Sequence, residues 1–355
     1  MKDMKRYFFL LFAPLVVGGL MALMAGSCNR PEPEPEPEPD PTPLTDFAKG
    51  ADVSWLTQME HDGCKFYTPA GKEMECMELL KTLGVNSIRL RVWVNPEGGW
   101  CGKEDVVAKA KRAKALGMRI MIDFHYSDSW ADPGKQNKPA AWKDLSFSAL
   151  REAMVEHTTD VLTALRDAGV TPEWIQIGNE TIGGMLWPDG QNYNDVGFGH
   201  YVDLNNSGYA AAKEVFPYAK VLIHVDKGQD ASQLNWFFNK CEQFGARYDM
   251  IGLSLYPDPG NMMQFRTQII NNIKNLYLAY EKDCIICELG MSWTEGTVCN
   301  DLIAGLMVSS LNEMEGHCQG IFYWEPEGYE SWSHYSKAAF SNEGRPTNAL
   351  YAFQN

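Results

Sequence analysis

The sequence has few basic residues for its length. It contains 31 Lys and Arg against 46 Asp and Glu, which gives a formal net charge of −15 at pH 7. A surface this negative is repelled by the phosphate backbone, which argues against nucleic acid as a partner. Gly and Pro, at 31 and 19 of 355 residues, are too rare for collagen. With 45% hydrophobic residues, the chain is neither a coiled coil nor wholly disordered.

Motifs of several common chemistries are also missing. No G-x-G-x-x-G or Walker sequence follows a predicted strand, which weakens a nucleotide-binding interpretation. The His residues show no H-E-x-x-H or other ligand spacing, so no metal is predicted and no cofactor is required. Cys284 and Cys287 have C-x-x-C spacing, but within a predicted strand their side chains point to opposite faces. Two buried small hydrophobes are a better interpretation than a redox or zinc pair.

Residues 1–27 have the pattern of an export signal. Three basic residues precede an almost entirely apolar run from Tyr7 to Ala25. The small residues before Cys28 resemble a bacterial lipobox, in which Cys28 becomes the acylated first residue, although Ala25 stands where Leu is commonest. An exported lipoprotein, membrane-anchored at the outer-membrane cell surface, is therefore expected. A simple secreted protein and a transmembrane anchor are the alternatives, because about 19 apolar residues could span a bilayer.

Residues 28–43 form a linker in which Pro alternates with Glu or Asp. Alternating Pro blocks helix and sheet pairing and the carboxylates repel one another, so an extended spacer is predicted. A single folded domain would then occupy residues 44–355.

From Leu44 onward, β-rich runs alternate with amphipathic helical patterns. The predicted strands are Gly50–Ser54, Ser87–Trp93, Arg119–Phe124, Trp174–Gly178, Lys220–Val225, Met250–Leu255, Cys284–Glu288 and Gly320–Trp324. The predicted helices are Lys72–Leu83, Glu104–Leu116, Ser148–Ala168, Val202–Phe216, Ser232–Phe244, Met262–Tyr280 and Asp301–Met314. Alternation of this kind indicates parallel strands with crossover helices. Eight units over roughly 310 residues favour an α/β fold of the closed (β/α)8 TIM-barrel type over an open sheet.

In such a barrel the chemistry lies at the carboxyl ends of the strands. Almost every predicted strand ends in polar or aromatic groups: Asp52, Arg89 and Arg91, Asp123 and His125, Asn179 and Glu180, His224 and Asp226, Tyr256, Glu288, and Trp324 with Glu325. Polar groups at such positions cost desolvation unless they are paired or used. Glu180 and Glu288, which end the fourth and seventh strands, would point into one cleft. A lone Glu there could be a salt-bridge partner, but glycoside hydrolysis needs such a pair.

Four segments carry a more specific resemblance: residues 50–54 (GADVS), 89–96 (RLRVWVNP), 123–133 (DFHYSDSWADP) and 176–180 (QIGNE). Together with Glu288 they resemble the arabinogalactan endo-β-1,4-galactanases of glycoside hydrolase family 53, within the clan of retaining (β/α)8 glycosidases. The resemblance runs from about Gly50 to the C-terminus. It implies cleavage of β-1,4-galactan, including the arabinogalactan side chains of pectin.

The resemblance implies roles for individual residues. Glu180 would be the general acid/base, with a raised pKa, and Glu288 the ionised nucleophile, held by Arg89 and Tyr256. Retention implies carboxyl groups ~5–5.5 Å apart. The remaining expected substrate-binding residues are Asp52, Arg91, Asp123, His125, Trp130, Asn179, His224 and Trp324. Of these, Asn179 would contact the sugar 2-hydroxyl. The sequence does not decide which of Arg89 and Arg91 reaches the site.

Several tryptophans and one loop also bear on the predicted sugar site. Trp93, Trp130, Trp187, Trp293 and Trp324 are stacking candidates, and each could equally be a core residue. Residues 291–298 are short where some bacterial family members carry a calcium-binding loop, so structural Ca²⁺ is possible but not predicted.

A disulfide between Cys64 and Cys101 is predicted, because both lie in loops that follow strands. The protein is expected to be a monomer. The alternatives to a galactanase are a β-mannanase or endoglucanase of the same clan, or a non-catalytic glycan-binding lipoprotein.

Overall fold

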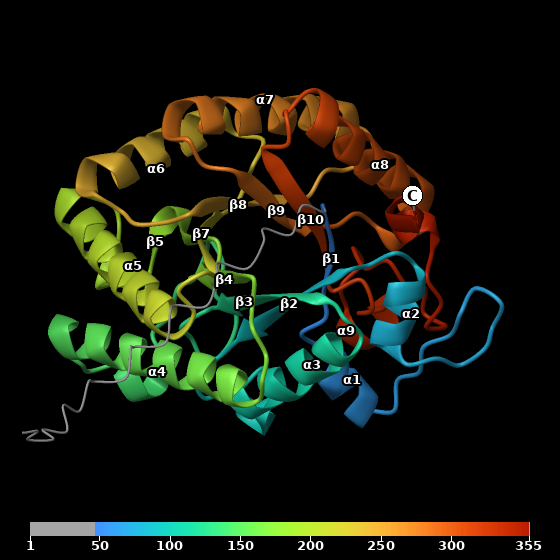
Figure 1. Cartoon of the computed structure of the whole chain (residues 1–355), viewed down its shortest axis with the longest axis horizontal. Coiled ribbons are helices and arrows are strands. Elements are labelled where there is room, and N and C mark those ends of the chain that lie inside the picture. Colours follow the sequence, from blue (N-terminus) through green and yellow to red (C-terminus); the bar gives the residue numbers. More distant parts are fainter. Residues whose placement is uncertain (1–46, 355) are drawn as a thin grey trace, which may run out of the picture. The chain divides into compact units, whose positions relative to one another are not determined.

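The computed structural model describes residues 47–354, and in this part eight parallel strands close into a barrel. Around the barrel the order is β1-β10-β9-β8-β7-β4-β3-β2, as Figure 1 shows. The barrel strands are β1 (Ala48–Asp52), β2 (Ser87–Val92), β3 (Arg119–Phe124), β4 (Trp174–Ile177), β7 (Lys220–Val225), β8 (Met250–Leu255), β9 (Cys284–Leu289) and β10 (Cys318–Trp324). The predicted (β/α)8 fold is confirmed.

Helices lie outside the barrel, and all but α9, which follows the last strand, lie in the connections between strands (Figure 1). They are α1 (Leu56–His61), α2 (Cys76–Thr82), α3 (Lys103–Ala115), α4 (Phe147–Asp167), α5 (Asp195–Val215), α6 (Ala231–Phe244), α7 (Met262–Tyr280), α8 (Gly296–Asn312) and α9 (Glu330–Ser333). A short antiparallel hairpin, β5 (Gly184–Met185) with β6 (Gly190–Gln191), follows β4. In the described part, no helix combines the length and the apolar character needed to cross a membrane.

The predicted helices and strands coincide with observed elements, but several of them begin or end at other residues than predicted. The helix predicted from Lys72 begins only at Cys76, because Glu75 has an extended backbone and its side chain accepts the N–H of Glu78 as an N-cap. The helices α5 and α8 each begin several residues before their predicted starts. Neither α1 nor the β5–β6 hairpin was predicted, since both are too short to show a period.

Alternation along the strands separates two apolar layers. One face packs against the helices, and the other fills the barrel interior with a second cluster, which consists of Ala48, Met121, Trp174, Leu222, Met250, Ile285, Cys287 and Phe322. Gly50 is required inside this barrel, because a Cβ there would lie 2.2 Å from the Phe322 ring. The interior cluster closes the barrel and leaves its carboxyl end for polar side chains.

The cysteines are free thiols in the described part. The guessed Cys64–Cys101 disulfide is therefore wrong: Cys101 is buried with its Sγ 3.4 Å from the carbonyl oxygen of Ser54, whereas Cys64 is half-buried in another loop. Cys284 packs in the outer cluster and Cys287 in the barrel interior, which confirms that their side chains face opposite ways. The predicted signal peptide, Cys28 and the Pro/Glu spacer lie outside the described residues.

Candidate active site

The chain leaves β4 through an irregular turn that directs two consecutive polar side chains over the barrel. Gly178 and Glu180 both have left-handed backbone conformations, with φ of +81° and +48°. A Cβ on Gly178 would lie 2.5 Å from Thr181 Cγ2, so only glycine fits there. Regular alternation would turn one of Asn179 and Glu180 away. The turn instead lets both contact residues on the inner face of the barrel.

A bulge in β9 does the same for Glu288. The register of β9 against β8 shifts here, because Ile286 pairs with Leu253 whereas Glu288 pairs with Ser254. The extra residue, Cys287, lies in the barrel interior, and the next side chain, Glu288, also faces inward. Such bulges re-aim side chains next to active sites. The two predicted carboxylates thus reach the same edge of the barrel by different departures from regular geometry.

Glu180 lies in an enclosed environment. Its Oε1 accepts a 2.7 Å hydrogen bond from Ser254 Oγ, and the neighbouring charge is that of Glu288. Burial, and then the negative charge of Glu288, raise the pKa of Glu180 well above its usual range. The hydrogen bond from Ser254 opposes this rise. Its surroundings therefore favour the protonated form of Glu180, the form that a general acid needs.

Glu288 is held by two strong donors. Arg89 Nη1 lies 3.0 Å from its Oε1, and the Tyr256 hydroxyl donates to its Oε2 at 2.7 Å. Burial raises the pKa of Glu288, but Arg89 and then Tyr256 act against that rise. In the described part Ser254 is the one side-chain donor to Glu180, whereas Glu288 has both Arg89 and Tyr256, so Glu288 is the better stabilised as a carboxylate and Glu180 is the better suited to carry a proton.

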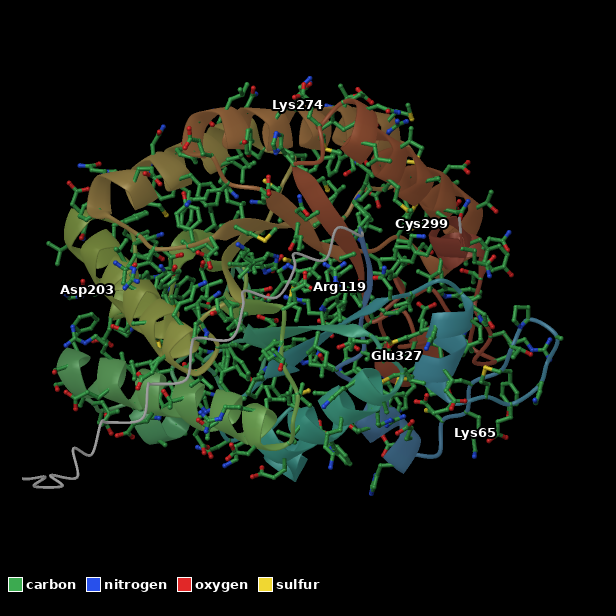
Figure 2. The ribbon with its side chains drawn as sticks, viewed as in Figure 1. Lys65, Arg119, Asp203, Lys274, Cys299 and Glu327 are labelled. Carbon is green, nitrogen blue, oxygen red and sulfur yellow. The ribbon has the colours of Figure 1, made fainter. Side chains whose placement is uncertain are left out.

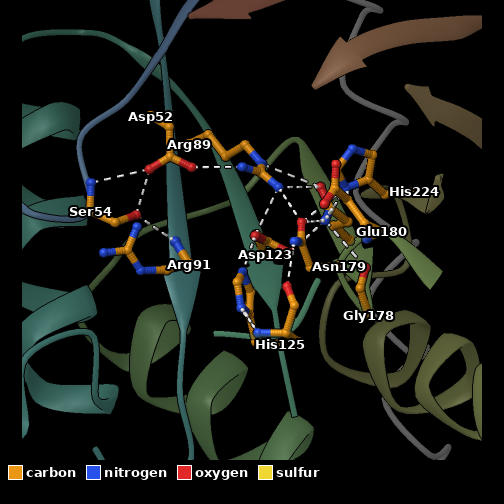
Figure 3. A network of polar contacts seen from close by, with 12 residues as sticks. Asp52, Ser54, Arg89, Arg91, Asp123, His125, Gly178, Asn179, Glu180 and His224 are labelled. Carbon is orange, nitrogen blue, oxygen red and sulfur yellow. Dashed lines mark hydrogen bonds and ion pairs between the residues drawn. The ribbon is translucent and has the colours of Figure 1, made fainter. Parts of the chain in front are cut away.

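Arg89, not Arg91, reaches the carboxylate pair. Its fully buried guanidinium also contacts Asp52 at 2.7 Å and Asp123 at 2.8 Å, and it donates to Asn179 Oδ1 at 2.9 Å (Figure 3). Asp52 is 0% exposed and accepts from Ser54 as well, so it lies behind Arg89 and not in the cleft. The guanidinium group has five N–H donors in one rigid plane, which lets Arg89 contact all of these side chains at once.

His224 links the site to the barrel interior. Its Nε2 lies 2.9 Å from Ser254 Oγ, while Gln176 Nε2 donates to its Nδ1 at 2.9 Å. Burial and the nearby Arg89 charge hold the pKa of His224 well below its usual value, so the ring is neutral. With a proton on Nε2, His224 donates to Ser254, and the Ser254 hydroxyl in turn donates to Glu180.

His125 is buried beside the same network. Its Nε2 donates to Asp123 at 3.0 Å and its Nδ1 accepts the N–H of Ala131 at 3.1 Å. Asp123 also accepts from Gln176. His125 therefore fixes the loop that carries Ala131, whose carbonyl in turn accepts from Asn179 Nδ2 at 2.9 Å.

Half-buried aromatic rings flank the polar network and form what we term the aromatic wall: Trp55, Trp93, Trp130, Trp324 and Tyr335. Three of them were stacking candidates. The other two candidates have hydrogen-bond partners of their own: Trp187 Nε1 donates to the carbonyl oxygen of Gly183, and Trp293 Nε1 donates to Glu330.

Sequence reasoning missed several residues that complete the site. Gln176 and Ser254 lie two positions before Gly178 and Tyr256, so the period-two pattern of their strands could have placed them inside the barrel. Trp55 and Tyr335 lie in loops, where no period operates. Within residues 47–354, His, Cys, Asp and Glu form no group of three that could hold a metal ion.

This chain is similar to known proteins both in sequence and in structure. Residues 48–353 match the family described as Glycosyl hydrolase family 53. An arabinogalactan endo-beta-1,4-galactanase of Thermothelomyces thermophilus is 30% identical over 86% of this chain and 98% of its own. A solved fungal beta-1,4-galactanase is 28% identical with a TM-score of 0.78, covering 86% of this chain and 98% of its own. The family 53 catalytic domain of Ignisphaera aggregans is 30% identical with a TM-score of 0.79, covering 89% and 98%.

Proposed function

Because the chain belongs to glycosyl hydrolase family 53, we propose that it is a retaining endo-β-1,4-galactanase, which cleaves internal β-1,4-galactosidic bonds of galactan and arabinogalactan side chains. One observation of the site supports this above the others. Glu180, whose pKa is raised well above its usual range by burial and by the charge of Glu288, lies at the mouth of the same barrel as Glu288, which Arg89 and Tyr256 hold. The galactanase relatives support the substrate.

In the first step, Glu288 attacks the anomeric carbon of a galactosyl unit while Glu180 donates its proton to the leaving glycosidic oxygen. The C–O bond to the departing chain breaks and a galactosyl ester with Glu288 forms. Arg89 and Tyr256 keep Glu288 ionised and fix its oxygens, so that the attacking atom is aligned before the substrate arrives.

In the second step, Glu180, now ionised, takes a proton from a water molecule that attacks the same carbon. The ester bond to Glu288 breaks, and the sugar leaves with its original configuration. Glu180 has recovered its proton and Glu288 its charge. The expected separation of the two carboxyl groups, ~5–5.5 Å, stays a prediction.

Asn179 is suited to bind the sugar 2-hydroxyl. Its Oδ1 accepts from Arg89, and one hydrogen of its Nδ2 goes to the carbonyl oxygen of Ala131. An amide nitrogen has two hydrogens, which leaves one to donate to the substrate. A contact to the 2-hydroxyl strengthens in the transition state of such enzymes.

The remaining parts of the proposal concern the surroundings of the enzyme. Lipidation at Cys28 and the Pro/Glu spacer would hold a monomeric catalytic domain off the cell surface, at the outer membrane. This rests on the sequence of residues 1–43. Mass spectrometry of the mature N-terminal peptide tests it: an acylated Cys28 is expected in the native chain, and an unmodified N-terminus would contradict the anchor.

Hydrolysis of defined polymers tests the function. The domain from Leu44 is incubated with linear β-1,4-galactan, β-mannan, a soluble cellulose derivative and xylan, with reducing ends and chain length followed over time. We expect rapid shortening of galactan alone, and its loss in Glu288→Ala. Cleavage of another polymer would reassign the substrate within the clan, and galactan binding without cleavage would make the protein a recognition module.

A further inference from the structure

A second pair of buried carboxyl groups follows β10, apart from Glu180 and Glu288. Glu325 and Glu327 are both 0% exposed, and Figure 2 shows Glu327 within the outline of the ribbon. The backbone at Glu325 is left-handed, with φ of +45°. Pro326 lies between the two residues, and its carbonyl oxygen accepts the N–H groups of Ala339 and Phe340, which fixes the turn. Two buried acids so close together need a reason, since an unpaired buried charge is costly.

The two side chains have unequal partners. Glu325 forms an ion pair with Arg91 Nη1 and accepts the N–H of Trp55 at 3.1 Å. Glu327 has no donor in the described part for either of its oxygens. As a carboxylic acid, however, Glu327 carries a proton of its own to donate, and the buried carboxylate two residues before it, Glu325, is an acceptor for that proton. Burial and the charge of Glu325 raise the pKa of Glu327 well above its usual range, in agreement with that assignment.

Arg91 connects this pair to the aromatic wall. Its Cζ lies 4.1 Å from the ring centroid of Trp130, 4.9 Å from that of Trp93 and 5.6 Å from that of Trp55. Its Nε and Nη2 atoms are buried and have no hydrogen-bond partner in the described part, so the rings and Glu325 are what hold the guanidinium. Arg91 therefore lies between Glu325 and these three rings and contacts all of them.

Glu325 fixes the wall at a second point. It binds the backbone of Trp55, and the Trp55 ring contacts Trp130 at 5.8 Å and Trp324 at 5.2 Å between centroids. Gly328 allows the chain to pass behind the Trp55 ring, because a Cβ there would lie 2.6 Å from a ring atom. Glu325 thus contacts the aromatic wall in two ways, through the Arg91 side chain and through the backbone N–H of Trp55.

We propose that Glu327 and Glu325 form a buried acid–carboxylate pair, in which Glu327 keeps its proton and donates it to Glu325, and that this pair positions the aromatic wall for substrate through Arg91 and the Trp55 backbone. Both are positioning residues, since neither reaches the cleft. The substrate part of this inference rests on the proposed galactanase function.

The pair acts on binding more than on chemistry. Glu180 and Glu288 are held by a different set of side chains, namely Ser254, Arg89 and Tyr256. A displaced wall would weaken the stacking of sugars on its rings in the ground state and the transition state alike. Loss of such uniform binding raises KM and leaves kcat nearly unchanged.

Three substitutions test the asymmetry of the pair on galactan. Glu325→Gln removes the charge that holds Arg91, so we expect KM to rise by about tenfold or more with kcat within threefold. Glu327→Gln keeps a donor to Glu325, so we expect KM to rise less than threefold. Glu327→Ala removes the donor, so KM should rise as in Glu325→Gln. Equal effects of the two Gln variants, or an effect on kcat instead of KM, would overturn the proposal.

The chain offers a matched control at the other end of the barrel. There Arg119 pairs with Glu173 and lies 4.4 Å from the Trp174 ring centroid, a group of the same type outside the site; Figure 2 labels Arg119. Glu173→Gln should leave KM unchanged, which separates positioning from a general loss of stability. If Glu325→Gln does not fold, Arg91→Lys keeps the charge but loses the planar stacking, and should raise KM alone.

An infrared measurement tests the proton without substrate. The difference spectrum between the parent protein and Glu327→Gln at pH 7 should contain the C=O stretch of a protonated carboxylic acid, shifted in D2O. Its absence would refute the assignment of the proton to Glu327. A protein that shows this band but does not cleave galactan would disprove the proposed function and leave the acid–carboxylate pair standing.

Discussion

Removal of the Ser254 hydroxyl should shift the pH profile of the enzyme. Ser254 Oγ donates to Glu180 at 2.7 Å and stabilises the ionised form of that carboxyl. In Ser254→Ala the pKa of Glu180, already raised by burial, should rise further. Glu180 must be protonated to act as the acid, so the alkaline limb of kcat/KM, which reports the acid in the free enzyme, should move to higher pH.

The size of the shift follows from the strength of the bond. A hydrogen bond to a charged group contributes about 1.5–3 kcal/mol. At about 1.4 kcal/mol for each pKa unit, its full loss would raise the pKa by roughly 1–2 units. Ser254 is buried, and in Ser254→Ala a water molecule in the space of the lost hydroxyl would replace part of the hydrogen bond to Glu180. The pKa shift should therefore lie near the lower end of this range. We expect a shift of about one unit.

The assay is kcat/KM for linear galactan over the pH range in which the protein is folded. Ser310→Ala is a matched control, because Ser310 is also buried but donates to the carbonyl oxygen of Cys318 on the outer side of the barrel. Its profile should coincide with that of the parent protein. The alkaline limb of Ser254→Ala could instead stay in place or move to lower pH. Either result would refute the identification of Glu180 as the general acid whose pKa Ser254 lowers.

Three further predictions follow from the site and the barrel. Tyr256→Phe removes a donor to Glu288, so kcat should fall by about 10- to 100-fold and the acid limb of the profile should move to higher pH, in steady-state kinetics. Gly50→Ala should lower the free energy of unfolding by about 3 kcal/mol in urea titrations, through overpacking inside the barrel, whereas Gly260→Ala, which meets nothing within 4 Å, should not. The folded protein holds a proton on Glu180 above the ordinary pKa of a Glu, so the free energy of unfolding should decrease as pH rises from about 5 through the raised pKa, and Glu180→Gln should flatten this dependence in thermal scans. A flat profile in the parent protein would contradict the raised pKa.

The sequence predicts the barrel fold well, and it also predicts which residues lie at the carboxyl ends of the strands. Period-two runs and strand-end polar groups are local features, and they located Arg89, Glu180 and Glu288. The same reasoning could not choose between Arg89 and Arg91, because both lie on one face of β2. That choice depends on which carboxylates the neighbouring strands bring alongside, which only the closed barrel determines.

Other features of the site depend on departures from regular geometry. Strict alternation places Cys287 inside the barrel and Glu288 outside it, and the bulge against β8 is what brings Glu288 inward. The left-handed backbone at Glu180 is similarly unforeseeable for a non-glycine residue. Both features are set by packing between strands that are far apart in the chain. The functional residues were therefore predictable by type and place, but their orientation was not.

The two arginines of β2 divide the site into two charge layers. Residues two apart on a strand lie about 6–7 Å from one another, on the same face. Arg89 lies in the deeper layer with Asp52, Asp123 and Glu288, and Arg91 lies nearer the cleft with Glu325. Each cation forms its ion pairs with a different set of carboxylates. This separation is the reason to expect that variants of the deeper layer alter kcat and the pH profile, whereas variants of the upper layer alter KM.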